Sequence, residues 1–155
     1  MRTLVLLLST ITAGIMAGVF FTYTNSVLPG LHRSEDRSFV DAMQRMNVAI
    51  QNGWFLLCFL GTLVLAVIAL VLHLGRAPLP WIAVGAGLYA VTLLITFAVS
   101  IPLNNALDAA GPPASIADFG VVRAAFERPW VPWNLVRTFT SLGAFASLAW
   151  ALVKV

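Results

Sequence analysis

The chain has 155 residues, of which 60% are hydrophobic and only 10% are charged. A soluble globular domain carries about 25% charged residues, so this composition excludes a soluble domain, a disordered chain and a coiled coil. Nine Lys and Arg against six Asp and Glu give a net charge of +3, which is too small for a nucleic-acid groove. We therefore expect an integral membrane protein without a nucleic-acid partner, and without a disulfide because Cys58 is the single cysteine.

Four stretches without Lys, Arg, Asp or Glu divide the sequence. Each contains an apolar run of about 17 to 25 residues, which is long enough to cross a bilayer as a helix. The spans are expected near residues 3–24, 54–73, 81–101 and 133–153. The first run is too long for the core of a secretory signal, so we interpret it as a retained span. The predicted fold class is all-α, a transmembrane four-helix bundle that forms a single integral membrane domain over the whole chain.

The charges outside the spans indicate an orientation. One side carries Arg2, Arg76 and Lys154 without any acidic side chain, whereas the other side carries six Arg and six acidic residues. An excess of Lys and Arg favours the cytoplasmic side. We therefore expect a multi-pass protein of the cell inner (plasma) membrane with both termini in the cytoplasm. Two long outer loops, about 25–53 and 102–132, then lie on the opposite side.

Both outer loops are expected to contain a short amphipathic helix. In the first, Ser34 is the expected N-cap, and Asn47 interrupts the apolar face. The apolar residues recur at helical spacing and are Phe39, Val40, Met43, Met46 and Ile50. In the second loop a Gly-Pro-Pro turn precedes a short helix expected from Ser115 or Ile116 to Phe126.

Polar residues within the spans share helical faces, and an intramembrane polar residue marks a candidate site because it must find a partner. On the fourth span the residues that share a face are Trp130, Asn134, Arg137 and Ser141. On the third span they are Gly85, Tyr89, Thr92, Thr96, Ser100 and Asn104. On the first span they are Gly14, Gly18, Phe21 and Asn25. Asn25, Asn104 and Arg137 fall near the outer ends of their spans. The sequence therefore predicts an outward-facing polar pocket with a fixed positive charge.

Each of these residues also has a purely structural explanation. Trp130 and Trp133 fit the aromatic belt of a membrane protein. Pro132 and Asn134 are usual at the start of a helix, and Arg137 can snorkel towards lipid phosphate. The convergence of three polar stripes favours a pocket over these separate explanations.

No metal site is expected. His32 and His73 fall on opposite sides of the membrane, and no span contains an HxxxH motif, a CxxC motif or a carboxylate pair. The lack of an acidic residue in any span also argues against an ion-coupled transporter.

Three motifs, in this four-span arrangement, resemble a known family. They are MQRMN at 43–47, IPLNNAL at 101–107 and PWVPWNLVRT at 129–138. The chain resembles the anthrone oxygenase-like family of small four-span membrane proteins. Family members from fungal polyketide pathways are associated with the oxidation of anthrones to anthraquinones by molecular oxygen, without metal or flavin. The resemblance implies a cofactor-independent oxygenase that acts on a lipophilic aromatic substrate.

Such chemistry requires a site that holds a flat apolar molecule, stabilises its developing oxyanion and excludes water. The resemblance then implies catalytic roles for Arg137, which would hold the oxyanion, and for Asn104 or Asn134, either of which would donate to the carbonyl oxygen. Trp130 and Trp133 would stack on the rings.

Asn25, Asn47 and Tyr89 are the other expected substrate-binding residues. Asn105 is an alternative to Asn104, because Pro102 disturbs the helical phase there. The base could be Asp108, His32 or water.

A second function belongs to a different class. In it, the protein is not catalytic, and the pocket binds a lipid, a quinone-like molecule or another membrane subunit. The sequence leaves a homo-oligomer open as well. Membrane lipid is an expected partner in either case.

Overall fold

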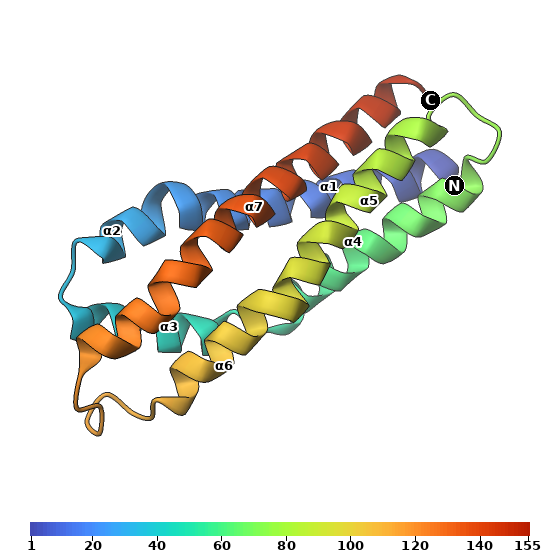
Figure 1. The fold of residues 1–155 in the computed structure, drawn as a ribbon. Coiled ribbons are helices and arrows are strands. Elements are labelled where there is room, and N and C mark those ends of the chain that lie inside the picture. Colours follow the sequence, from blue (N-terminus) through green and yellow to red (C-terminus); the bar gives the residue numbers. More distant parts are fainter.

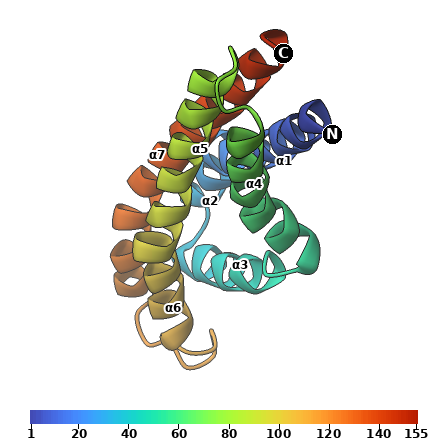
Figure 2. The same cartoon turned by 90° about the vertical axis from the view of Figure 1, so that its right-hand side faces the viewer.

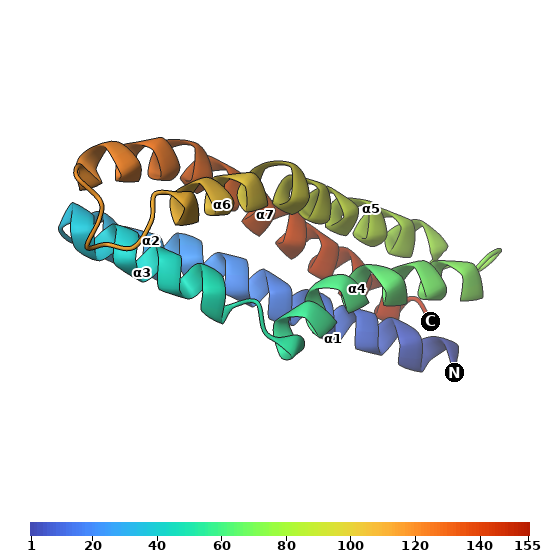
Figure 3. The same cartoon turned by 90° about the horizontal axis from the view of Figure 1, so that it is seen from below.

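The computed structural model describes residues 1–155 and is entirely helical. In chain order the elements are α1 (Arg2–Thr22), η1 (Tyr23–Val27), α2 (Leu28–His32), α3 (Asp36–Ala49), α4 (Gly53–Leu72), α5 (Leu79–Ile95), η2 (Thr96–Ser100), α6 (Ile101–Ala109) and α7 (Phe119–Val153). The elements η1 and η2 are wide π-helical turns. They join α1 to α2 and α5 to α6 without a break in the ribbon (Figure 3).

Four helices are long and apolar enough to cross a membrane. They are Arg2–His32, Gly53–Leu72, Leu79–Ala109 and Phe119–Val153. Only 22% of the most apolar stretch of α4 is buried within the protein, and large apolar side chains such as Leu57 and Val64 are exposed. In water such exposure would be unfavourable, but lipid is as apolar as these side chains. The fold is therefore that of a multi-pass membrane protein.

The two ends of the bundle differ in construction. Figure 1 shows both termini and the connection between α4 and α5 at one end, and α3 and α6 at the other. After a quarter turn, α3 bridges the space between α6 and the start of α4 (Figure 2). Helix α3 packs against α7 and α6, so it covers the end of the bundle opposite the termini.

The buried apolar side chains form three clusters. The first, at the end covered by α3, is made of Leu28, Phe39, Val40, Met43, Leu107, Phe126 and Trp130. The second joins the terminal halves of α1, α4, α5 and α7, and contains Leu6, Ala13, Ala69, Ile82, Leu148 and Ala151. The third consists of Met16, Phe20, Phe59, Tyr89, Leu93 and Ala144. The candidate site lies between the first and third clusters. It is lined by Trp130 from the first cluster and by Phe20 and Phe59 from the third.

Three of the long helices extend beyond their predicted limits. The first continues to His32 and the third to Ala109, and the fourth begins at Phe119 rather than near residue 133. The predicted limits of the first, third and fourth spans are therefore wrong, and residues 25–32, 102–109 and 119–132 continue the long helices. These helices continue beyond their most apolar stretches because their ends pack on the first cluster.

The helix expected in the first outer loop is present as α3. Its N-cap is Glu35 rather than Ser34, and the Ser34 hydroxyl donates instead to the carbonyl of Leu31 over 2.6 Å. The separate helix expected between Ser115 or Ile116 and Phe126 does not exist, because residues 119–126 are the first part of α7 and residues 115–118 are not helical.

Helix α7 runs through two prolines, Pro129 and Pro132. Each removes a backbone donor and would normally end or kink a helix, which is why the sequence suggested a helix start at Pro132. Tertiary packing maintains the helix here, since the buried rings of Phe126 and Trp130 lie in the first cluster against side chains of α2, α3 and α6.

Candidate functional site

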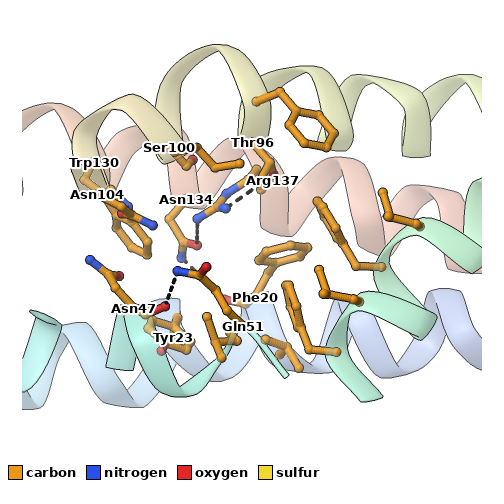
Figure 4. Close-up of a pocket in the computed structure, with 18 of the residues that line it drawn as sticks. Phe20, Tyr23, Asn47, Gln51, Thr96, Ser100, Asn104, Trp130, Asn134 and Arg137 are labelled. Carbon is orange, nitrogen blue, oxygen red and sulfur yellow. Dashed lines mark hydrogen bonds between the residues drawn. The ribbon is translucent and has the colours of Figure 1, made fainter. Parts of the chain in front are cut away.

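A cavity of about 260 Å³ lies between the long helices, beneath the end covered by α3. This volume is slightly below the range of roughly 300–1,000 Å³ that is common for small-molecule sites, so it suits a compact ligand. Figure 4 shows polar side chains facing one another in one half and apolar side chains in the other. The polar residues of the lining are Tyr23, Asn47, Gln51, Thr96, Ser100, Asn104, Asn105, Asn134 and Arg137. No Asp, Glu or His lines the cavity.

Arg137 is the one cationic side chain of the cavity, and it is only 5% exposed. Its Nη2 donates to Asn134 Oδ1 over 2.8 Å, and its Nη1 to Thr96 Oγ1 over 3.4 Å. Its Nε has no partner, and no carboxylate forms an ion pair with it. The guanidinium carbon lies 4.7 Å from the ring centroid of Phe20 and 5.0 Å from that of Trp130. Aromatic faces and neutral oxygens therefore surround a buried positive charge.

Asn134 positions this guanidinium. Its side chain is fully buried, with Oδ1 facing Arg137 and with Nδ2 donating to Thr24 Oγ1 over 2.9 Å. The Thr24 hydroxyl also shares a hydrogen bond with the Thr138 hydroxyl, which donates to the carbonyl of Phe20. The amide is thus fixed by a chain of hydrogen bonds that joins α7 to α1 and η1.

Trp130 and Asn104 form a second polar pair. The Trp130 Nε1 donates to Asn104 Oδ1 over 2.8 Å, which fixes the ring that faces Arg137. Both Asn104 and Asn105 line the cavity. The side chain of Asn105 makes no hydrogen bond to Trp130, and Asn105 is more exposed than Asn104. Asn104 is therefore the better placed of the two alternatives.

Helix α3 covers the polar half of the cavity with Asn47. This side chain is 5% exposed, and its Nδ2 has no hydrogen-bond partner. Gln51 donates to the backbone carbonyl of Asn47 over 2.9 Å (Figure 4). A buried donor without an acceptor costs about 1–3 kcal/mol. Two such donors, on Asn47 and Arg137, therefore line the same cavity and could both be satisfied by ligand oxygens.

The cavity opens sideways between α4 and the α5–η2–α6 helix. Four of its apolar lining residues are also 37–54% exposed, namely Leu56, Leu60, Phe97 and Ile101. Helix α4 packs closely on α1 but much less on α5, and it has no extensive contact with α6. These residues belong to two of the helices that are long and apolar enough to cross a membrane.

The structure places all eight predicted site residues, but only five of them line the cavity: Asn47, Asn104, Trp130, Asn134 and Arg137. Asn25 is exposed and lies outside it. The buried face of α1 runs through Ala13, Met16 and Phe20. The predicted stripe is therefore one residue out of phase, which rotates it by about 100° on an α-helix.

Trp133 and Tyr89 lie elsewhere for different reasons. Trp133 is 41% exposed and points away from the cavity, as an aromatic belt residue would. Tyr89 is fully buried in the third cluster and donates to the carbonyl of Phe59 over 2.9 Å. Both positions fit a structural role rather than direct contact with a ligand in this cavity.

Neither residue considered as a base reaches the cavity. His32 Nδ1 contacts Glu127 Oε1 at 2.7 Å on the outer surface, and Asp108 is exposed beside α3. Within the cavity, the ionisable side chains are Tyr23 and Arg137.

Sequence reasoning missed several lining residues. Tyr23 and Phe20 were missed because the inward face predicted for the first helix was one residue out of phase. Phe55 and Phe59 line the apolar half from α4, but α4 is apolar on all sides, so its sequence carries no signal for the inward face. Gln51 follows Asn47 by four residues, and this helical spacing is the signal that could have identified it.

Comparison with known proteins identifies the chain's relatives at the level of a family. The sequence model of the anthrone oxygenase family matches residues 54–147, which is more than half of the chain. The chain belongs to the anthrone oxygenase family. The family match covers α4, α5, α6 and much of α7, and so contains Asn104, Trp130, Asn134 and Arg137; Phe20, Tyr23 and Asn47 precede it. No curated protein and no solved structure matches the chain significantly.

Proposed function

We propose that the cavity binds a flat lipophilic aromatic molecule with an oxygen that can become negatively charged, and that the protein promotes oxidation of this molecule by molecular oxygen. The substrate class is an anthrone or a closely similar phenolic ketone. Arg137 holds the oxyanion, Asn134 positions Arg137, and the apolar half of the cavity holds the rings.

The observation that carries this proposal is the buried guanidinium of Arg137, which has no carboxylate partner. An Arg within a membrane span is costly unless it meets a partner or a polar cavity, and such residues are therefore rare. Fixed dipoles and a fixed charge stabilise a developing oxyanion strongly, because they are already oriented and need not reorganise during the reaction. A ligand oxyanion would supply the missing countercharge.

The proposed reaction balances with oxygen as the only oxidant. Loss of a proton from the methylene carbon of an anthrone gives an enolate, whose negative charge lies largely on oxygen. The enolate gives one electron to O₂, and the two radicals combine at that carbon to form a hydroperoxide after protonation. Loss of water from the hydroperoxide leaves the quinone carbonyl, so one oxygen atom enters the product and the other leaves as water.

The residues present support enolate formation by electrostatics. Arg137 lowers the free energy of the enolate relative to the neutral ketone, so that water in the outer part of the cavity can accept the proton. Asn104, fixed by Trp130, and Asn47, whose Nδ2 has no hydrogen-bond partner, both line the cavity and can bind further oxygens of the ligand.

The sideways opening supports a lipophilic substrate. A planar aromatic ketone dissolves in the bilayer and could reach the cavity between Leu60 and Phe97 without passing through water. The product could leave by the same route.

The orientation belongs to the proposal too. The end with both termini faces the cytoplasm, because Arg2, Arg76 and Lys154 cluster there. In intact cells, a membrane-impermeant maleimide should label Ser38→Cys but not Ala77→Cys, with the parent and its single Cys58 as the background. The reverse pattern would contradict this orientation.

Oxygen uptake by the purified protein with an anthrone tests the reaction. The parent should consume one O₂ per anthrone faster than the spontaneous oxidation, and Arg137→Gln should fall to the spontaneous rate. Arg137→Lys keeps the charge and should retain part of the activity. Arg128→Gln is the matched control, since Arg128 is an exposed residue of the same helix outside the cavity.

The outcome also separates the two classes of function. Equal oxygen uptake by the parent and by Arg137→Gln would refute the assigned role of Arg137. If the parent binds the anthrone at a site that requires Arg137 but consumes no oxygen above the spontaneous rate, the protein is a binding protein and the catalytic part of the proposal fails.

A further inference from the structure

A second pocket lies at the other end of the bundle, far from the cavity. Its volume is about 430 Å³, and its lining consists of Arg2, Thr3, His73, Arg76, Ala77, Pro78, Lys154 and Val155. These residues come from the start of α1, the α4–α5 connection and the end of α7. Figure 1 shows these three parts of the chain meeting at one end.

The pocket concentrates positive charge that the protein does not neutralise. Its lining contains no Asp or Glu side chain. None of Arg2, Arg76 and Lys154 forms an ion pair. The contact recorded for Lys154 is with the ring of Trp150, at 5.0 Å from Nζ to the ring centroid. Three cationic side chains from separate parts of the chain therefore share one concave space in which no acidic side chain pairs with them.

His73 adds a fixed polar group to the floor of this pocket. It is only 2% exposed. Its Nδ1 lies 2.7 Å from the carbonyl of Ala69 and therefore carries the proton that it donates to that oxygen. This contact holds the ring in place and leaves Nε2 free of the backbone. A buried imidazole at the base of three cationic side chains distinguishes the pocket from scattered basic residues on a membrane surface.

We infer that this pocket binds a phosphate-bearing anion, with the headgroup of an anionic phospholipid as its source in the membrane. Basic pockets between transmembrane helices on the cytoplasmic side are suited to such headgroups, and each nearby Lys or Arg contributes about 1 kcal/mol. The pocket lies at the ends of the candidate membrane spans, where lipid headgroups are expected. A free inorganic phosphate has the same chemistry, so the experiment must distinguish the two sources.

This site is independent of the proposed oxygenase reaction. It shares no lining residue with the cavity that contains Arg137. A headgroup there would join the first, second and fourth spans at their ends, and would therefore raise the thermal stability of the protein.

The test uses the full chain, purified in a neutral detergent, and measures the melting temperature during titration with phosphatidylglycerol. Phosphatidylcholine is the zwitterionic control, and inorganic phosphate is the free-anion probe. The parent should show a saturable rise in melting temperature with phosphatidylglycerol but not with phosphatidylcholine. Arg76→Gln and Lys154→Gln should each weaken binding about five-fold, which corresponds to about 1 kcal/mol per charge.

Arg33→Gln is the matched control, because Arg33 is an exposed Arg without an ion pair at the opposite end of the molecule. It should bind phosphatidylglycerol as the parent does. If inorganic phosphate competes at millimolar concentration, the free anion is the ligand; if it does not, the lipid is. The inference is overturned if neither probe binds saturably, or if Arg33→Gln weakens binding as much as Arg76→Gln.

Discussion

Arg137 and Asn134 form a buried pair in which the guanidinium Nη2 donates to the amide Oδ1 over 2.8 Å. A neutral amide orients the guanidinium without neutralising it. An aspartate in the same position would form a bidentate or single salt bridge with the same geometry. The choice of amide rather than carboxylate therefore leaves the charge of Arg137 available to a ligand.

Asn134→Asp tests this distinction directly. The substitution keeps the size and shape of the side chain but supplies the countercharge. We expect the melting temperature to stay the same or to rise, while the affinity for an anthrone falls at least ten-fold, which is about 1.4 kcal/mol. Thermal unfolding and an equilibrium binding titration measure the two effects. Asn25→Asp, on the exposed face of η1, should change neither. Undiminished binding by Asn134→Asp would mean that Arg137 does not meet a negative ligand.

Trp130→Phe tests the pair that Trp130 makes with Asn104. The variant loses the hydrogen bond to Asn104 Oδ1, which is worth about 0.5–1.5 kcal/mol, and places a weaker cation-binding ring beside Arg137. We expect a lower melting temperature and an affinity for the anthrone several-fold below that of the parent. Trp133→Phe changes an exposed ring outside the cavity and should leave the affinity unchanged. Equal effects of the two variants would exclude a special role for Trp130.

Leu60→Trp tests access from the bilayer. Leu60 borders the sideways opening of the cavity, so a larger side chain there should slow the loading of a membrane-dissolved anthrone. Stopped-flow absorbance with protein in lipid vesicles measures the association rate, which we expect to fall several-fold. Leu57→Trp places the same ring on the same helix, at an exposed position that does not line the cavity. If Leu57→Trp slows association equally, the opening is not the route.

Arg123→Gln tests what holds α3 over the cavity. The guanidinium of Arg123 donates to Glu127 Oε2 over 2.7 Å, to Asp36 Oδ1 over 2.9 Å, and to the carbonyls of His32 and Ser34. These bonds tie the connection between α2 and α3 to α7. Asp36 is half exposed, so solvent weakens the contribution of its ion pair with Arg123. We therefore expect the unfolding free energy of the variant to fall by about 2 kcal/mol.

Hydrogen exchange should show where the loss of Arg123 acts. We expect faster exchange in residues 32–50 and little change in α5. Arg45→Gln removes an exposed pair with Asp41 on the same helix α3, which should cost only about 0.3–0.5 kcal/mol. A uniform increase in exchange across the whole chain would indicate general destabilisation instead.

The sequence was sufficient to predict the four spans, because a helix that crosses a bilayer needs a long stretch without charged residues, and such stretches can be recognised directly in the sequence. It was also sufficient for the inward face of α7, where Trp130, Asn134, Arg137 and Ser141 all lie on the buried side. Polar residues there recur at helical spacing against an apolar background. The same signal predicted Asn47, which stands alone on the apolar face of α3.

Other features could not be read in this way. Helix ends outside the lipid depend on tertiary packing, so neither the continuation through Pro129 and Pro132 nor the extension to His32 was visible. The phase of α1 was ambiguous, because small and polar residues occur on more than one face, and a shift of one residue exchanges Asn25 for Thr24. In α4 nearly every residue is apolar, so only the structure shows that Phe55 and Phe59 line the cavity.

The two π-helical turns, η1 and η2, have a consequence for how this chain can change in length. Each holds one more residue per turn than an α-helix would, and both lie on walls of the cavity, which Tyr23 lines from η1, and Thr96 and Ser100 from η2. Because each π-helical turn accommodates one extra residue within an otherwise α-helical run, deleting that residue would restore the ordinary pitch with little rotation of the helix beyond it. In η2, such a deletion would keep Asn104 on the side of Trp130 but would remove the wide turn from the wall of the cavity. The molecule should therefore tolerate the loss of one residue at these turns better than in the neighbouring α-helices, where the loss would rotate everything beyond it by about 100°.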